Sequence, residues 1–370
     1  MKMAIVHEWY GSYGGAEETL LQMAESCKFA DVYVLKIDKD VPLKKSNEVF
    51  LKESWYAKFV GSDNRALAAI LSPLVFRTLT MKKYDLVVSS SHTFAHTAKI
   101  INSRDTKYLS YVYTPSRTLW TPEIDSRGVP DSLGGVRRPL RFLDNKLGSH
   151  VDSYAAISSE VQSRIFKFWN RTSSVIHPPV RLIDEEINTQ FPKAFPYKEK
   201  EYLISAGRLV KYKRHDFAID VAEELGKPLV ILGNGPEEMS LRKKADSSKF
   251  PVLFVTNADR QQFLSLLKGS NCLIFPSHED FGIVPVEALS LGVPVVAFSE
   301  GGVRDYVKDN INGFLISELS VELFAEAVDR INFSPISLAE SVKNFSAKRF
   351  RHDFQFWITE QTGYEFHDES

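Results

Sequence analysis

Short runs of consecutive apolar residues recur along the chain, and amphipathic stretches separate them. Continuous apolar runs are typical of strands buried on both faces of a parallel sheet, whereas half-buried strands alternate. The intervals between the runs suit helices, for example at 214–225, 260–268 and 285–291. This alternation predicts the α/β class with doubly wound parallel sheets. We expect strands at 3–6, 32–35, 86–89, 108–113, 154–157, 202–205, 229–232, 252–255, 272–275, 295–298 and 313–316.

A change in composition divides this pattern into two domains. The segment 178–200 is polar, carries four prolines and lacks a strand pattern, which is typical of a linker. We predict two Rossmann-like domains that face a central cleft, because ligands of open α/β sheets bind beyond the carboxyl ends of the strands. The expected boundaries are 1–177 for the first domain, 178–200 for the linker, 201–345 for the second domain, and 346–370 for a C-terminal helix that crosses back to the first domain.

Composition narrows the classes of function. The chain has 370 residues, 46 Lys plus Arg against 47 Asp plus Glu, and a net charge of -1, so no global charge favours nucleic acid as a partner. The two cysteines lie far apart among apolar neighbours, which favours a reducing compartment over a disulfide framework. The N-terminus does not have the pattern of a signal peptide, and no run of about 18 apolar residues predicts a membrane span. We therefore expect a cytoplasmic protein.

The junction after the strand that ends at Phe275 is the first candidate site. A polar loop follows this strand, and a helix begins near Gly282, where a ligand can approach the backbone closely. Pro285 suits the first turn of that helix, where no N–H donor is needed. The free N–H groups of Gly282, Ile283 and Val284 would then point at an anion, and the helix dipole would add to them.

Two carboxylates flank this junction. Glu279 lies in the loop before the helix and Glu287 lies inside it. Carboxylates on either side of a phosphate-binding turn can hold the hydroxyl groups of two sugars. The alternative is that both glutamates are solvated surface charges.

The loop that follows the strand at 202–205 carries the matching positive charge. Arg208 can hold a phosphate with a forked pair of hydrogen bonds, and Lys213 supplies a compact charge. Together they can neutralise a diphosphate leaving group. The alternative here is a basic, solvated loop.

Glycine pairs follow two other strands. Gly14 and Gly15 open the first helix, where they permit a tight turn close to a ligand. The full pattern G-x-G-x-x-G is absent, so a dinucleotide-dependent oxidoreductase is poorly supported. Gly301 and Gly302 also follow a strand, and they indicate a ligand-binding turn less strongly. Either pair alone is compatible with a plain turn.

Taken in order, these motifs resemble the family-4 retaining glycosyltransferases of the two-Rossmann-domain, GT-B type, especially the mannosyltransferase-like members that build bacterial lipopolysaccharide and capsule. The resemblance covers nearly the whole chain. It rests on Gly14-Gly15-Ala16-Glu17, Ser89-Ser90-Ser91-His92, Thr114-Pro115 with Arg117 and Trp120, Pro178-Pro179-Val180, Gly207-Arg208-Leu209 with Lys213, and the E-x7-E pair Glu279 and Glu287.

The resemblance implies a role for each position. The donor would be a GDP- or UDP-linked sugar, with no further cofactor and no divalent metal. The reaction would retain the anomeric configuration, by departure and attack on one face. Arg208 and Lys213 would bind the donor diphosphate, Glu287 the ribose hydroxyls, Glu279 and the backbone after Phe281 the transferred sugar, and Gly14 and Gly15 the diphosphate from the N-terminal side.

The chain departs from the family pattern at Tyr113. Relatives usually carry His-Thr-Pro where this chain has Tyr-Thr-Pro, and that histidine lies beside the donor sugar. A tyrosine hydroxyl can still hydrogen-bond a sugar or phosphate oxygen. His92 and, less readily, His96 follow a neighbouring strand and are further candidates. Asp38-Lys39-Asp40 is the only Asp-x-Asp, and we interpret it as a solvated loop rather than a metal site.

Two basic and apolar stretches, 55–81 and 136–146, concern the acceptor. We favour core helices with a solvated basic face, and keep peripheral contact with the inner face of an anionic membrane as the alternative. The predicted function is transfer of a hexose, mannose or a related sugar, to a growing, polyprenyl-linked glycan. The alternatives are a nucleotide-sugar epimerase of the same fold and a non-catalytic partner that binds the nucleotide sugar.

Overall fold

The computed structural model describes residues 1–11, 14–38, 51–54, 73–77, 83–100, 105–122, 134–182 and 191–366. Contacts divide the chain into two compact units. The first unit comprises Met1–Pro179 and Ala347–Ser370, and the second comprises Val180–Ser346. None of the helices in the described part of the chain has the length and apolar character needed to span a bilayer.

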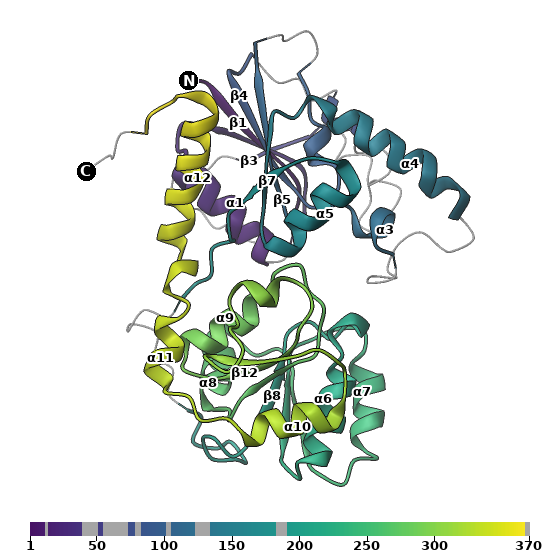
Figure 1. The fold of residues 1–370 in the computed structure, drawn as a ribbon, viewed down its shortest axis with the longest axis vertical. Helices are drawn as coiled ribbons and strands as arrows, with labels where there is room; N and C mark the ends of the chain where they lie inside the picture. The colour runs from purple at the N-terminus through teal and green to yellow at the C-terminus, as the bar shows by residue number, and fades with distance from the viewer. Residues whose placement is uncertain are drawn as a thin grey trace. The chain divides into compact units, whose positions relative to one another are not determined.

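The first unit is built on a seven-stranded parallel sheet with the order β3-β2-β1-β4-β5-β6-β7 (Figure 1). The neighbours pair in parallel throughout, and β4 lies directly beside β1, with Ala4 opposite Val87. Its strands are β1 (Met3–Tyr10), β2 (Asp31–Ile37), β3 (Leu51–Glu53), β4 (Leu86–Ser91), β5 (Lys107–Val112), β6 (Ser153–Ala156) and β7 (Ser173–Val175).

Helices follow β1, β5 and β6, and the last helix of the chain returns to this unit. In Figure 1, α12 runs alongside α1, and the two helices are in contact. The buried face of α12 carries Phe350, Phe354 and Trp357 at helical spacing, and Phe350 packs edge-on against Tyr111 of β5. The helices are α1 (Gly15–Ser26), α3 (Arg117–Trp120), α4 (Gly134–Leu147), α5 (Ser159–Trp169) and α12 (Ala347–Thr362), with short 3₁₀ turns at Ala95–Thr97 and Gly148–His150.

The second unit is built on a six-stranded parallel sheet with the order β10-β9-β8-β11-β12-β13. Its strands are almost entirely apolar, and the four central ones are almost entirely buried, as in the run Leu229–Leu232. The strands are β8 (Leu203–Ala206), β9 (Leu229–Leu232), β10 (Val252–Val255), β11 (Leu273–Phe275), β12 (Val295–Phe298) and β13 (Gly313–Ile316). The helices are α6 (His215–Glu224), α7 (Glu238–Ala245), α8 (Arg260–Gly269), α9 (Ile283–Ser290), α10 (Val321–Asp329) and α11 (Pro335–Glu340), with 3₁₀ turns at Lys211–Lys213, Gly302–Asp305 and Lys343–Phe345.

The predicted fold class of two doubly wound parallel-sheet domains is confirmed. Each predicted strand overlaps an observed one. The sequence pattern missed β3 and β7, which are short edge strands whose residues are half-buried or exposed. A strand at a sheet edge needs no continuous apolar run, so it leaves no strong signal.

The chain crosses between the units at two neighbouring points. The Val180 N–H donates to the Phe345 carbonyl at 2.8 Å, just before the second crossing. We expected 178–200 to be a linker. Its described residues after 190 pack on the second unit, where Phe191 and Phe195 contact Tyr202. Residues 183–190 of that segment lie outside the described residues.

Both sheets reverse their strand order at one place, between β1 and β4 in the first unit and between β8 and β11 in the second. In open α/β sheets the ligand binds outside the carboxyl ends of the strands at such a switch point. Most of the predicted motifs follow these four strands, whereas Tyr113 follows β5 and the Gly301–Gly302 pair follows β12. The strand order therefore selects these two loop pairs as the candidate sites.

Candidate functional site

At the switch point of the second unit, the loops after β8 and β11 meet through an ion pair. Lys213 Nζ lies 2.8 Å from Glu279 Oε1, and the side chains are 12% and 15% exposed. The Ser277 hydroxyl donates to the same oxygen at 3.2 Å. Two predicted residues that are far apart in sequence are therefore in direct contact. A half-buried pair of this kind is screened less by solvent than a surface pair.

Arg208 lies in the same β8–α6 loop with its side chain exposed. In the described part of the chain, its guanidinium has no ion pair or hydrogen bond. Its backbone is held by His215, whose Nε2 lies 3.3 Å from the Arg208 carbonyl and whose Nδ1 lies 2.8 Å from the Ser205 hydroxyl. Burial lowers the pKa of His215 to about 4, with a further contribution from Lys213. The neutral ring therefore donates to Arg208 and accepts from Ser205. Sequence reasoning missed this histidine.

The backbones of the loops after β8 and β9 touch at glycines. A Cβ atom at Gly233 would lie 2.0 Å from the Gly207 carbonyl oxygen, and one at Gly235 would lie 2.2 Å from the Leu209 carbonyl oxygen. The Leu209 N–H also donates to the Asn234 carbonyl at 2.8 Å. Only glycine fits this approach. The Gly-x-Gly spacing after a strand was the signal that could have identified it.

Gly282 is the N-cap of α9, which therefore begins where it was predicted, and its φ of +87° favours glycine. The buried Tyr306 hydroxyl lies 2.8 Å from both the Phe281 and Gly282 carbonyl oxygens and fixes this turn. Within the described part of the chain, no group accepts a hydrogen bond from the N–H groups of Gly282, Ile283 or Val284. These three amides are the unsatisfied donors of a helix start, which suit an anion.

The Gly301–Gly302 pair supports the segment that carries Glu279. The Gly302 N–H donates to the Glu279 carbonyl at 2.9 Å, and a Cβ atom at Gly301 would lie 2.2 Å from that oxygen. The pair is therefore a close backbone contact between the loops after β11 and β12. This contact holds the Glu279 backbone in place.

Glu287 lies inside α9 and is 5% exposed. Its Oε1 accepts a hydrogen bond of 2.5 Å from Arg260 Nη2, at the start of α8. Burial raises the pKa of Glu287, while Arg260 and Arg181 act in the opposite direction. Sequence reasoning did not select Arg260, because α8 follows a different strand of the sheet.

In the first unit, Gly14 and Gly15 lie at the start of α1, as predicted. The Tyr113 side chain is buried, and its hydroxyl lies 2.9 Å from the Ser90 hydroxyl and 3.2 Å from the Ala16 carbonyl oxygen. Burial raises the pKa of Tyr113, so the phenol stays neutral. The hydroxyl therefore connects the C-terminal end of β4 to the first turn of α1.

The loop that follows β4 is organised by Glu8, a residue that sequence reasoning missed. Its fully buried carboxylate accepts from the backbone N–H groups of His92 (3.1 Å), Thr93 (2.9 Å), Phe94 (2.8 Å) and Ala95 (2.7 Å). Burial alone would raise the pKa of Glu8, but the neighbouring histidines and these N–H groups lower it to about 2. The His92 ring lies beside the carboxylate, with Nε2 3.6 Å from Oε2.

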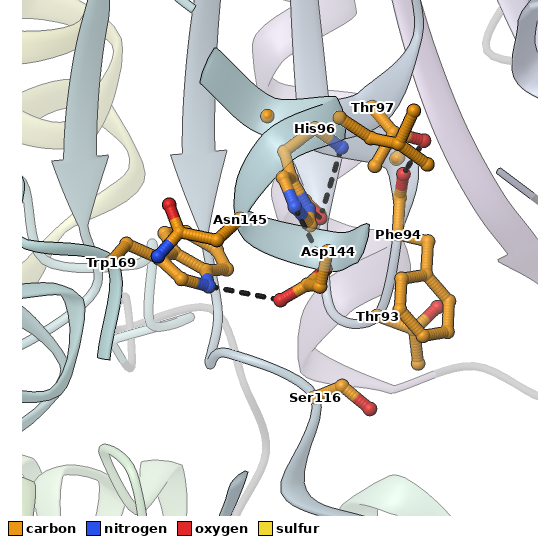
Figure 2. A network of polar contacts seen from close by, with 12 residues as sticks. Thr93, Phe94, His96, Thr97, Ser116, Asp144, Asn145 and Trp169 are labelled. Carbon is orange, nitrogen blue, oxygen red and sulfur yellow. Dashed lines mark hydrogen bonds and ion pairs between the residues drawn. The ribbon is translucent and has the colours of Figure 1, made fainter. Parts of the chain in front are cut away.

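His96 lies in a different environment from His92. It is buried, and its Nε2 lies 3.1 Å from Asp144 Oδ1 of α4, an ion-pair distance whose geometry is not that of a hydrogen bond. Figure 2 shows that Trp169 also points at this carboxylate. The Trp169 and Trp120 indoles donate to Asp144 Oδ2 at 3.0 and 2.8 Å. This network anchors α4 to α3, to α5 and to the 3₁₀ turn Ala95–Thr97.

In the basic and apolar stretch on α4, some side chains contact the rest of the protein and others are exposed. Arg141 donates to the Leu119 carbonyl at 2.8 Å and lies over the Trp120 ring. Arg138 is exposed, and Phe142 and Leu143 are 69% and 44% exposed. The other stretch, 55–81, lies outside the described residues except for 73–77. Lys39 and Asp40 of the Asp-x-Asp also lie outside them.

Comparison with known proteins relates the chain to glycosyltransferases in sequence and in fold. Residues 186–349 match the family described as Glycosyl transferases group 1. The chain is 22% identical over 363 residues to the human alpha-1,3/1,6-mannosyltransferase ALG2, covering 87% of this chain and 85% of the human protein. The lipopolysaccharide outer core galactosyltransferase WaaB has a TM-score of 0.70 at 16% identity, covering 98% of this chain and 100% of WaaB. Anabaena HepE in complex with UDP has a TM-score of 0.69 at 17% identity, covering 98% of this chain and 100% of the HepE chain. Residues 186–349 therefore resemble the group 1 glycosyltransferases, and the chain has the two parallel-sheet units of the GT-B fold.

Proposed function

We propose that this glycosyltransferase is a retaining, metal-independent enzyme that moves a hexose from a GDP- or UDP-linked donor to a growing, polyprenyl-linked glycan. The contact between Lys213 and Glu279 carries this proposal. It joins the two loops at the switch point of the second sheet and places a cation and a carboxylate where a ligand of such sheets binds. HepE, a structure of similar fold, is in complex with UDP.

The donor diphosphate is the leaving group, and its negative charge grows as the bond to the sugar breaks. Arg208 has an exposed guanidinium, and Lys213 is held nearby by Glu279. The three amides at the start of α9 add donors in the same loop pair. Positive groups aimed at developing charge stabilise the transition state, and here they supply the charge that a metal would otherwise supply.

The two carboxylates recognise the donor's hydroxyl groups. Glu287 is buried inside α9 and takes the ribose, while Glu279 takes the transferred hexose. In the reaction, the bond between the anomeric carbon and the diphosphate oxygen breaks. The acceptor oxygen bonds to that carbon from the same face, and its proton passes to the departing phosphate oxygen. Mannose or a related hexose is the proposed sugar, and the similar human protein is named as a mannosyltransferase.

The first unit contributes the Gly14–Gly15 turn and His92. We assign Tyr113 a positioning role, because its hydroxyl binds Ser90 and the Ala16 carbonyl rather than lying free. The turn would lie against the diphosphate. The ring of His92, fixed over Glu8, would hydrogen-bond a donor or acceptor oxygen.

The acceptor's lipid places the enzyme at a membrane surface. On α4, exposed Arg138 lies in the same helix as the exposed apolar side chains of Phe142 and Leu143. Basic and apolar residues together favour binding to an anionic bilayer. We propose that α4 makes this peripheral contact at the inner face.

A thermal-shift panel of UDP, GDP, dTDP, ADP and their sugars tests the donor. A ligand stabilises the folded protein in proportion to the logarithm of its concentration over its dissociation constant, so one base should raise the melting temperature most. Transfer is then assayed with a polyprenyl-linked acceptor. Release of an altered free sugar without acceptor would instead identify an epimerase.

Two variants separate binding from chemistry. Arg208→Ala should lower kcat by roughly a hundredfold, because the guanidinium acts most strongly on the developing charge. Glu287→Ala should raise the donor KM by about tenfold with a smaller change in kcat, because ribose contacts are similar in both states. Lys243→Ala, at an exposed position on α7, is the control and should match the wild type. Unchanged donor affinity in a folded Glu287→Ala protein would refute the ribose assignment.

A further inference from the structure

Arg260 lies beside the buried carboxylate of Glu287. The arginine is the first residue of α8, directly after its N-cap Asp259, and its Nη2 donates to Glu287 Oε1 at 2.5 Å. The Glu287 side chain is 7% exposed, whereas that of Arg260 is 46% exposed. The guanidinium also lies 5.8 Å from the Phe263 ring, one turn along the helix. The arginine is therefore held from two sides while it faces the carboxylate.

We propose that Arg260 is a positioning residue for donor binding, which keeps Glu287 ionised and oriented so that its other oxygen accepts from the ribose. This inference rests on the proposed function, in which Glu287 binds the ribose. In the described part of the chain, Oε2 accepts no hydrogen bond, while Oε1 is occupied by Arg260. The pair thus leaves one carboxylate oxygen for a hydroxyl donor.

The physical reason is the burial of Glu287. Burial raises the pKa of this carboxyl, and Arg260 opposes the effect through its charge and its hydrogen bond. Arg181, which follows Val180, is the other charged group acting on Glu287 in the described residues. An ionised carboxylate only accepts hydrogen bonds, whereas a protonated one loses an acceptor and gains a donor. Without Arg260, more of the protein would carry the neutral carboxyl as the pH falls, so donor affinity would fall with it.

Isothermal titration calorimetry with UDP and with GDP tests this, using the nucleotide that binds the wild type more tightly. Arg260→Met removes the charge and keeps an apolar stem. We expect its nucleotide affinity to fall about tenfold at neutral pH, because a charge-assisted hydrogen bond to the carboxylate is lost. The loss should grow as the pH is lowered, because the carboxyl that has lost Arg260 is protonated more readily than in the wild type. Arg260→Lys should restore most of the affinity, and Lys243→Met is the matched control.

Two further measurements distinguish a positioning role of Arg260 from a purely structural one. The transferase reaction of Arg260→Met should show a raised donor KM with kcat within about twofold of the wild type, since Arg260 acts through binding. Glu287→Gln should bind the nucleotide weakly at every pH, because an amide does not titrate. A change of stability alone would not produce this pH dependence.

The outcomes separate the two proposals. If folded Glu287→Gln binds nucleotide like the wild type, the ribose assignment fails, whatever Arg260→Met does. If Glu287→Gln is weak while Arg260→Met binds normally across the pH range, the ribose assignment stands and the role of Arg260 is wrong. A tenfold loss in Arg260→Met that does not vary with pH, or that Arg260→Lys does not rescue, would also overturn the role of Arg260.

Discussion

Glu8→Gln should destabilise the first unit, because it removes a buried charge while keeping the shape of the side chain. The carboxylate accepts from four consecutive backbone N–H groups, the shortest at 2.7 Å from Ala95. It also lies within hydrogen-bond distance of the Ser91 and Thr93 hydroxyls, at 3.3 and 3.2 Å. The glutamine keeps one acceptor oxygen, but a neutral acceptor makes weaker bonds than a charged one.

The size of the expected loss of stability follows from the pKa of Glu8. Its ordinary value of 4.5 is lowered to about 2 in the folded protein, a difference worth about 3 kcal/mol. Because the folded-state pKa is below the unfolded-state value, this stability is present above pH 4.5 and is lost as the pH falls toward 2. Glu8→Gln should therefore cost about 3 kcal/mol at neutral pH, and the difference from the wild type should vanish in acid.

Amide hydrogen exchange is the suitable assay, since a chain of two units need not unfold in one step. Protection of the amides from His92 to Ala95 should fall by roughly a hundredfold in Glu8→Gln at neutral pH, if they exchange through loss of this structure. Glu25→Gln, at an exposed position on α1, is the control. It should change the free energy of opening of these amides by less than about 0.5 kcal/mol.

His7 provides an internal check on the acid range. Burial lowers its pKa to about 4 from 6.5, so it destabilises the folded state as the pH falls between those values. The Glu8 carboxylate itself raises the pKa of His7, so the two proteins are compared at neutral pH, where the His7 ring is neutral in both and their difference reports on Glu8. Equal protection of the four amides at neutral pH, or a Glu8 carboxyl that titrates by NMR near 4.5, would refute the reasoning.

Three further predictions concern metal dependence, the role of Tyr113 and binding to membranes. Turnover should continue in EDTA, because Arg208 and Lys213 supply the positive charge; loss of activity that magnesium or manganese restores would contradict this. Tyr113→Phe should lower stability by about 1 kcal/mol, measured by thermal unfolding, and leave nucleotide affinity nearly unchanged, because its hydroxyl is engaged by Ser90 and by the Ala16 carbonyl. Arg138→Glu on α4 should weaken binding to anionic lipid vesicles, and added salt should weaken wild-type binding; absence of wild-type binding at low salt would favour a soluble acceptor.

The sequence was sufficient to predict the two parallel sheets. A strand buried on both faces must be apolar along its length, and runs such as those of β9 and β12 have that property. The helix start at Gly282 was also predictable, because glycine at a strand end and proline in the first turn are local signals. β3 and β7 were missed because half-exposed edge strands need no such run.

Only the tertiary structure decided which distant residues meet. The apolar pattern is compatible with any strand order, so it did not place β11 beside β8, which brings Lys213 to Glu279. The same holds for Arg260 at Glu287, and for Glu8 at the loop after β4. A buried carboxylate is stabilised by partners that the packing of whole strands and helices brings to it, and those partners are not its neighbours in sequence.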